Sequence, residues 1–187
     1  MPIRRQRLLV VLGSAIVLTV AVAWVVFGWS SGMDAAREQA VRTSVDTYYE
    51  QHHWHGSLED SHPNQGVRWF CAGQVIESDA NQQETAVGIL EMCQEFVAMD
   101  GELIVGSGEA APRLVTVTSP PKPVDVLRVE APGDGSRYSP WVDANFSWIG
   151  VRKLHWLQQN SVPDLENATV VKARTAFGLP ADAPVHR

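Results

Sequence analysis

The chain has 187 residues, of which 45% are hydrophobic, and a formal net charge of −6 at pH 7. This length suits one globular domain with its own core, and the acidic balance argues against attraction to nucleic acid or anionic lipid through the overall field. The two cysteines, Cys71 and Cys93, are predicted to form one intramolecular disulfide, and two small buried thiols are the alternative.

An uncharged run of 26 residues extends from Leu8 to Met33, directly after arginines at positions 4, 5 and 7. Its apolar core, 8–29, is long enough to cross a membrane because about 20 helical residues span a hydrocarbon core of about 30 Å. The arginines favour a cytoplasmic N-terminus at 1–7 and place the rest of the chain outside. The sequence therefore predicts a single-pass protein of the cell membrane with a signal-anchor helix.

A cleaved signal peptide is the alternative. Ala21-Val22-Ala23 matches a small-residue cleavage site after an apolar stretch of suitable length. The apolar run continues past this site through Trp24 to Phe27, so that cleavage would leave a greasy N-terminus. Both interpretations export the C-terminal part, which holds all 21 acidic and 12 of the 15 basic residues and has a formal charge of −9.

The predicted exported domain, 34–178, begins with a helix over 34–55, where Val41, Val45 and Tyr48 recur at helical spacing. Strands follow, because β-branched and aromatic residues alternate between turn residues. The predicted strands are 68–78, 85–99, 102–108, 114–118 and 124–130, with a polar turn at 79–83 and a tight hairpin at Asp100-Gly101.

The cysteines predict the register of the first hairpin. If Cys71 faces Cys93, the hairpin centres on Gln82, inside the polar turn. Alternation then assigns two faces. The first face holds Phe70, Ala72, Ile76, Leu90, Met92 and Phe96, and the second, the cysteine face, holds Trp69, Cys71, Glu91, Cys93 and Glu95. We expect the first face to meet the core and the helix, and the cysteine face to be the more open one.

The C-terminal third predicts helices over 138–146, 151–159 and 164–177, with Gly178 as a stop signal and a disordered tail at 179–187. Together the elements predict an α+β fold, in which a long helix packs on a curved antiparallel sheet with C-terminal helices. This arrangement is that of a cystatin-like or NTF2-like roll, an analogy that carries no function.

Histidines cluster after the first predicted helix, and four of the six lie between His52 and His62. Neutral imidazole binds transition metals and also titrates near neutral pH. His52, His53 and His55 are therefore candidate metal ligands or pH sensors, although they lack the spacing of an established metal motif. A polar helix end that tolerates histidine is the alternative.

Other motifs favour structural roles. Gly106 to Ala111 matches a G-x-G-x-x-A pattern, but no βαβ unit surrounds it, so a strand bulge is favoured over a nucleotide site. Glu91 and Glu95 could perform acid–base chemistry, although an exposed sheet face explains them more simply. Trp141, Trp148 and Trp156 could line one helical face, either as core or as a docking stripe.

Several short strings resemble small uncharacterised membrane-anchored or exported proteins of high-G+C Gram-positive bacteria. The resemblance covers about 67–147 and implies no activity, ligand or catalytic residue, although it is consistent with a structural disulfide. The matching strings are Trp69-Phe70-Cys71-Ala72, Cys93-Gln94-Glu95-Phe96, Gly106-Ser107-Gly108 with Ala111-Pro112, and Pro132-Gly133-Asp134-Gly135 with Tyr138.

The sequence therefore favours a non-catalytic domain that binds a protein partner or small ligand at the cell envelope, without a cofactor and without nucleic acid. A metal- or pH-responsive module that uses the His52–His62 tract is the first alternative. An enzyme on an NTF2-like cone that uses Glu91 or Glu95 is the second.

Overall fold

The structure is a computed structural model, and it describes residues 31–187 except positions 54 and 82. The predicted cytoplasmic segment 1–7, the predicted membrane helix 8–29 and the cleavage motif at 21–23 lie outside the described residues. Within the described part, no helix has the length and apolar character needed to cross a membrane.

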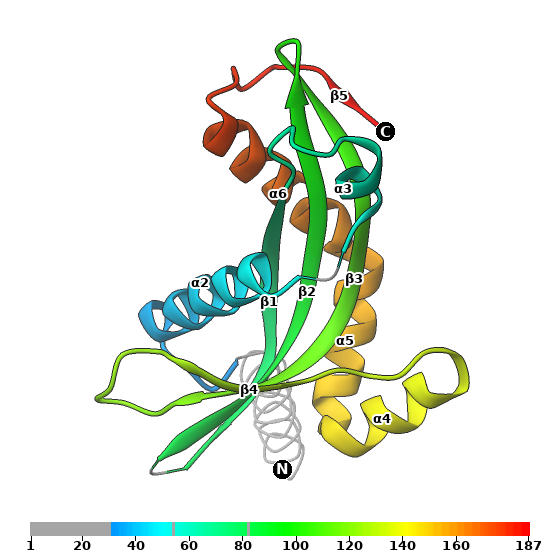
Figure 1. Ribbon diagram of the computed structural model, residues 1–187. Helices are drawn as coiled ribbons and strands as arrows, with labels where there is room; N and C mark the ends of the chain where they lie inside the picture. The colour runs from blue at the N-terminus through cyan, green and yellow to red at the C-terminus, as the bar shows by residue number, and fades with distance from the viewer. Residues whose placement is uncertain (1–30, 54, 82) are drawn as a thin grey trace, which may run out of the picture. The chain divides into compact units, whose positions relative to one another are not determined.

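In chain order, the described residues form helices before and after a set of long strands, and the helices lie on either side of these strands (Figure 1). The helices are α2 (Ala35–Gln51), α3 (Ser57–Ser61), α4 (Tyr138–Asn145), α5 (Trp148–Asn160) and α6 (Val162–Phe177), with a 3-10 turn η1 (Gly135–Arg137) before α4. The strands are β1 (Arg68–Ala80), β2 (Glu84–Met99), β3 (Glu102–Thr118), β4 (Val126–Glu130) and β5 (Val185–His186).

The strands form one mixed sheet, so the fold is α+β. The first four strands pair in chain order as antiparallel neighbours, whereas β5 pairs in parallel with β3. The expectation of a purely antiparallel sheet is thereby corrected, because the chain returns after α6 beside β3. Leu103 N donates to Pro184 O at 2.9 Å, so residues 179–187 contain a strand where a disordered tail was expected.

The predicted register of the first hairpin is confirmed. Cys71 pairs with Cys93 and the two form a disulfide with a Cα–Cα distance of 4.1 Å. This short separation is typical of a non-hydrogen-bonded antiparallel pair. A bulge between Val75 and Glu77 shifts the pairing by one residue before the turn.

Local signals mark most of the element ends. Asp34 caps α2 by accepting a hydrogen bond from Arg37 N at 2.8 Å. Asp100 and Gly101 both have positive φ, as the tightest antiparallel hairpin turn requires. Gly178 ends α6 in the left-handed conformation that glycine adopts without a steric penalty.

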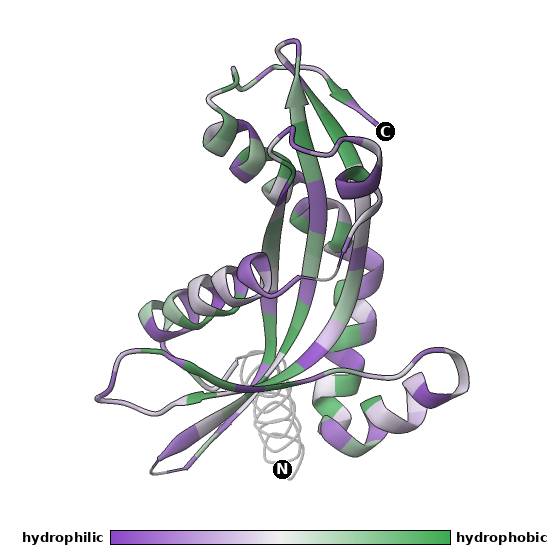
Figure 2. Cartoon of the chain, in the orientation of Figure 1, coloured by the Kyte–Doolittle hydropathy of each residue, from purple (hydrophilic) through white to green (hydrophobic). Residues whose placement is uncertain are grey.

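Helices cover both faces of the sheet, and this corrects the predicted sidedness. α2 packs on the cysteine face, where it buries Val41 and Val45 against the disulfide, and α4, α5 and α6 cover the opposite face (Figure 1). The prediction that the cysteine face is the more open one is wrong. Purple bands interrupt the mostly green β2 in Figure 2, because the buried polar residues Glu91, Gln94 and Glu95 lie on this strand.

β3 runs without a break through the two strands predicted on either side of Pro112. Pro112 pairs with Leu90, three residues from the non-hydrogen-bonded pair at Cys93. Alternation along β2 therefore directs the Pro112 nitrogen away from β2, toward the side on which β4 first pairs at Leu114. A proline is tolerated there because no ladder hydrogen bond is lost.

The disulfide should contribute measurably to stability. It links residues 22 apart in sequence. A bridge across a loop of this size stabilises the folded state by about 3 kcal/mol, because it lowers the conformational entropy of the unfolded chain. In urea unfolding, we expect a reductant to lower the transition midpoint of the wild type and to leave that of a Cys71→Ala/Cys93→Ala variant unchanged. In thiol labelling of the folded, non-reduced protein, we expect neither cysteine to react. Labelling of both cysteines would contradict the disulfide.

Candidate functional site

The predicted histidine tract forms the end of α2 and the loop that leads to α3. His52 is exposed and stacks on Tyr48, with ring centroids 4.3 Å apart and planes 17° from parallel. Its Nδ1 lies 2.8 Å from Tyr48 O, so this nitrogen carries the proton and donates. His52 therefore belongs to the surface of α2 and stands apart from the other two candidates.

His53 and His55 share one carboxylate. The two Glu59 oxygens lie 3.2 Å from His53 Nε2 and 2.5 Å from His55 Nδ1. His55 Nε2 also lies 2.8 Å from Asp60 Oδ1, and this hydrogen bond raises the pKa of His55 above its ordinary value. The arrangement favours protonated imidazole, because acceptors occupy both nitrogens of His55.

The three histidines do not gather around one point. Across residues 31–187, positions 54 and 82 apart, the metal-ligating side chains that come close in a group of three are Cys71, Glu91 and Cys93. Because the two sulfurs are joined in the disulfide, this group offers no thiolate. Metal binding by His52, His53 and His55 stays a prediction.

Glu95 anchors the histidine loop to the sheet. Its carboxylate accepts from Leu58 N at 2.9 Å, Glu59 N at 3.0 Å and Ser107 N at 3.1 Å. The first two donors are the free amides at the start of α3, where a negative charge is favoured. Ser107 belongs to a bulge in which two residues of β3 oppose Glu95, which confirms a bulge at the glycine motif.

Glu91 is buried without such donors. It is 1% exposed, and no donor in the described part of the chain reaches either of its oxygens. Its neighbour is the Asp46 carboxyl of α2, and burial followed by the Asp46 charge raises the pKa of Glu91 well above its ordinary value. Two neighbouring carboxyl groups hydrogen-bond only when one carries a proton, and the raised pKa makes Glu91 the group of the pair that is favoured to be protonated.

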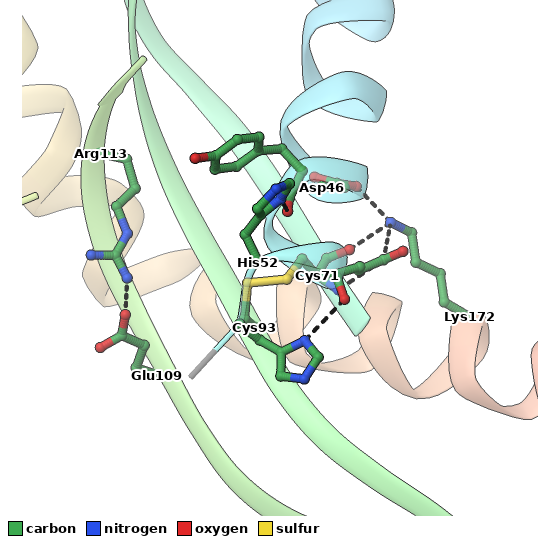
Figure 3. The surroundings of a disulfide bond; sticks show 10 residues. Asp46, His52, Cys71, Cys93, Glu109, Arg113 and Lys172 are labelled. Carbon is green, nitrogen blue, oxygen red and sulfur yellow. Dashed lines mark hydrogen bonds and ion pairs between the residues drawn. A yellow bond between two sulfur atoms is a disulfide. The ribbon is translucent and has the colours of Figure 1, made fainter. Parts of the chain in front are cut away.

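Lys172 of α6 neutralises Asp46 from the edge of β1 (Figure 3). Its Nζ lies 2.6 Å from Asp46 Oδ2 and 2.5 Å from Cys71 O. Burial lowers the pKa of Lys172, but the bond to Asp46 outweighs it and the net shift is upward. Burial also raises the pKa of Asp46, an effect that Lys172 partly offsets.

Arg113 lies near the buried carboxyl pair, where its charge opposes the rise in the pKa of Glu91. It forms an ion pair with Glu109 along β3 (Figure 3). Its guanidinium carbon lies 5.3 Å from the ring centre of Tyr49. Burial raises the pKa of Tyr49 to about 12 despite the nearby arginine charge. The phenol is therefore neutral at physiological pH and packs as an aromatic side chain.

Glu91 and Glu95 are thus buried, and the prediction of an exposed sheet face is wrong for both. Their partners Asp46, Arg113 and Lys172 were not predicted from the sequence. No local signal identifies them, because Lys172 is 126 residues from Asp46 and Arg113 lies on a different strand.

An open groove of about 440 Å³ lies between α2 and the chain that enters β4. Hydroxyl groups, an amide and the stacked pair Tyr48 and His52 line the α2 wall, and two valines with one carboxylate line the other. Ser44 Oγ donates to Val124 O at 3.3 Å, and this hydrogen bond links the two walls. The lining residues are Thr43, Ser44, Thr47, Tyr48, Gln51, His52, Val124, Asp125 and Val126.

The three tryptophans of the tail separate into different environments. Trp141 is half-buried on α4 and contacts Phe146 edge-on, with ring centroids 5.9 Å apart. Trp148 and Trp156 lie on α5 and are 68% and 45% exposed. The prediction of one shared helical face is wrong, since two helices carry these residues, and the two on α5 are largely outside the core.

No protein-family model matches the chain, and comparisons with curated proteins and with solved structures found no significant match.

The two buried glutamates should respond in opposite directions to the same isosteric change. Glu91 gains a proton on folding, so its contribution to stability is present at low pH and is lost as the pH rises through its folded pKa. Glu91→Gln mimics the protonated group and should raise the free energy of unfolding by about 1–3 kcal/mol at pH 8, with a smaller effect at pH 4.

Glu95→Gln is the matched variant. Its amide group would meet one of three N–H donors, which should cost about 1–3 kcal/mol at both pH values. Urea unfolding measured at pH 4 and pH 8 checks both expectations. Equal destabilisation by the two variants would contradict the shared proton between Glu91 and Asp46.

Proposed function

We propose that this chain is a membrane-tethered, non-catalytic binding protein that holds a neutral, hydroxyl-rich ligand, such as a carbohydrate chain, in the groove between α2 and β4. The observation that carries this proposal is the composition of the groove, which is open to solvent and lined by side chains that both donate and accept hydrogen bonds. Val124 and Val126 supply the apolar wall that such a ligand packs against.

The distribution of charge supports binding over catalysis. The titratable groups with strongly raised pKa values are Glu91 of β2 and Tyr49 of α2. Both are buried between α2 and the sheet, and neither lines the groove. The carboxylates of Glu91 and Glu95 are closed off by protein, so a substrate in the groove would not reach them. An enzyme that uses these glutamates therefore has less support than a binding site, and no cofactor is part of the proposal.

The tether is proposed from the sequence. The uncharged run from Leu8 to Met33 would hold the protein in the cell membrane as a single span, with residues 1–7 inside and the α+β domain outside. The charge of −9 beyond residue 33 disfavours nucleic acid as a partner. The signal-peptide alternative, with cleavage after Ala23, would release the same domain.

We further propose that the domain is a variant of the cystatin-like or NTF2-like roll. A long helix, α2, lies across long curved antiparallel strands, as in those folds (Figure 1). The present domain adds α4, α5 and α6 on the opposite face of the sheet. This likeness concerns the fold and supplies no function.

A bulky side chain in the groove tests the binding function. Thr47 is exposed in the groove and donates its hydroxyl to the i−4 carbonyl oxygen of Thr43 at 2.8 Å. Thr47→Trp should weaken binding of neutral oligosaccharides to the full chain at least about tenfold, because the indole occupies the site. Binding is measured by titration of the purified chain in detergent against a panel of neutral oligosaccharides.

Thr175→Trp is the matched control. Thr175 is also an exposed helical threonine that donates to the i−4 carbonyl oxygen, that of Val171 at 2.9 Å, and it lies on α6 away from the groove. We expect this variant to bind as the wild type does. A panel with no member whose binding depends on position 47 would reject the proposal.

A pH-responsive role of the histidine loop is the second candidate function, and the observation that favours it is the carboxylate shared by His53 and His55. Protonation would strengthen the bonds of His55 to Glu59 and Asp60. Because Glu59 also lies at the start of α3, which Glu95 holds, the loop would become more firmly fixed as the pH falls.

Removal of one acceptor tests this candidate. In a nuclear magnetic resonance titration, the His55 ring should titrate above the ordinary value of about 6.5, and Asp60→Asn should lower that midpoint. Asp164→Asn, an exposed change at the start of α6, is the control and should leave it unaltered. A wild-type midpoint at or below the ordinary value would contradict the role.

A further inference from the structure

α5 presents an aromatic and basic surface that the proposed groove does not use. Trp148, its first residue, is 68% exposed, and the Arg152 guanidinium carbon lies 5.0 Å from the centre of its ring. Trp156 follows one turn beyond Arg152 and is 45% exposed. Such large exposed aromatic side chains mark interaction surfaces, because indole gains strongly from burial.

The start of the described chain is fixed to β1 beside the residue that holds the start of α5. Ser31 is buried, and its carbonyl oxygen accepts from Ser78 Oγ of β1 at 2.6 Å. Glu77, which directly precedes Ser78 in β1, accepts from Ser147 N at 2.7 Å and also from Ser147 Oγ. Ser147 is the N-cap of α5 and directly precedes Trp148. Adjacent residues of β1 thus hold Ser31 on the α2 face of the sheet and the start of α5 on the opposite face.

The arrangement of the strands agrees with these contacts. Figure 1 shows the β1–β2 hairpin and the first turn of α5 at the same end of the domain, opposite the C-terminus. Because Ser31 is bonded to Ser78 near this hairpin, the start of the described chain lies at the same end of the domain as the first turn of α5.

The length of chain between the proposed span and the domain limits their separation. The apolar core ends at Trp29, and two residues reach at most about 7 Å when fully extended. The polar layer on each side of a bilayer is about 5–8 Å thick. Ser31, and with it the end of the domain that carries Trp148, would lie at the membrane surface.

The chemistry of α5 matches a lipid headgroup layer. Arg152 and His155 are exposed on a helix that contains no acidic residue, in a domain whose formal charge is −9, whereas Lys153 of the same helix is buried. Tryptophan prefers the membrane interface, and a guanidinium group binds phosphate in a bidentate manner. The neighbouring Glu77 carboxylate is occupied by Ser147.

We infer that the outer surface of α5 around Trp148 and Arg152 rests on the phosphate layer of the membrane that holds the N-terminal segment, and fixes the orientation of the domain. This inference rests on the proposed tether. The ligand is the phospholipid headgroup, with the Trp148 ring at the interface and Arg152 on phosphate.

The test uses the full chain in vesicles of phosphatidylcholine and phosphatidylglycerol. Since Cys71 and Cys93 are joined, Trp148→Cys supplies a single reactive thiol for an environment-sensitive fluorophore. A lipid with a nitroxide on its headgroup should quench the fluorophore at position 148 at least about twofold more strongly than the same fluorophore attached at the control position, Thr175→Cys. Adding Arg152→Glu should bring the quenching at position 148 toward the control value, because the carboxylate repels phosphate.

Alkaline extraction of the same vesicles separates the two proposals. Release of the chain by alkali would overturn the tether. If the chain stays with the vesicles and positions 148 and 175 are quenched equally, the tether stands and the contact of α5 with the membrane is overturned. Stronger quenching at position 148 in a chain that resists extraction supports both.

Discussion

Lys172 joins the two helical layers of this domain around the edge of the sheet. It belongs to α6 on one face, yet its ammonium contacts Asp46 of α2, on the other face, and the carbonyl oxygen of Cys71 between them. β1 is the edge strand, and the Cys71–Cys93 pair leaves the backbone groups of Cys71 pointing outward. Glu50 accepts from Cys71 N at 3.0 Å, so α2 and α6 together satisfy both groups.

This link determines the state of the buried acids. With Lys172 on Asp46, one negative charge is balanced, and Glu91 is left to take the proton because Asp46 and burial both disfavour a second charge. Glu95, four residues along the same strand, is buried to the same degree but is surrounded by three N–H donors. Burial alone therefore does not decide the role of a carboxyl group; the number of donors around it does.

Much of the fold follows from local patterns. Turn residues at Asp100-Gly101, the stop at Gly178 and the pairing of the cysteines each depend on few neighbouring residues, and each is found as predicted. The sidedness of the sheet could not be predicted in the same way. Acidic residues on one face of β2 are typical of solvent exposure, and the groups that bury them come from remote parts of the chain.

The candidate site was predictable only in its composition. The sequence shows that histidines cluster after the first helix, but the contacts that divide His52 from His53 and His55 depend on the turn into α3. The groove is likewise a product of tertiary structure. The polar residues of α2 that line it, among them Thr43 and Thr47, are unremarkable for a solvent-facing helix until β4 is placed beside them.

The proposed contacts, taken together, restrict where a ligand would be held. α2 begins four residues after Ser31, and a helix of 17 residues is about 25 Å long. The groove is lined by the second half of this helix, so it would lie within that distance of the membrane surface. A domain fixed at Ser31 and again through α5 could not rotate freely about its tether. The groove would then face one constant direction in the layer next to the membrane, which suits recognition of an extended chain lying along that surface.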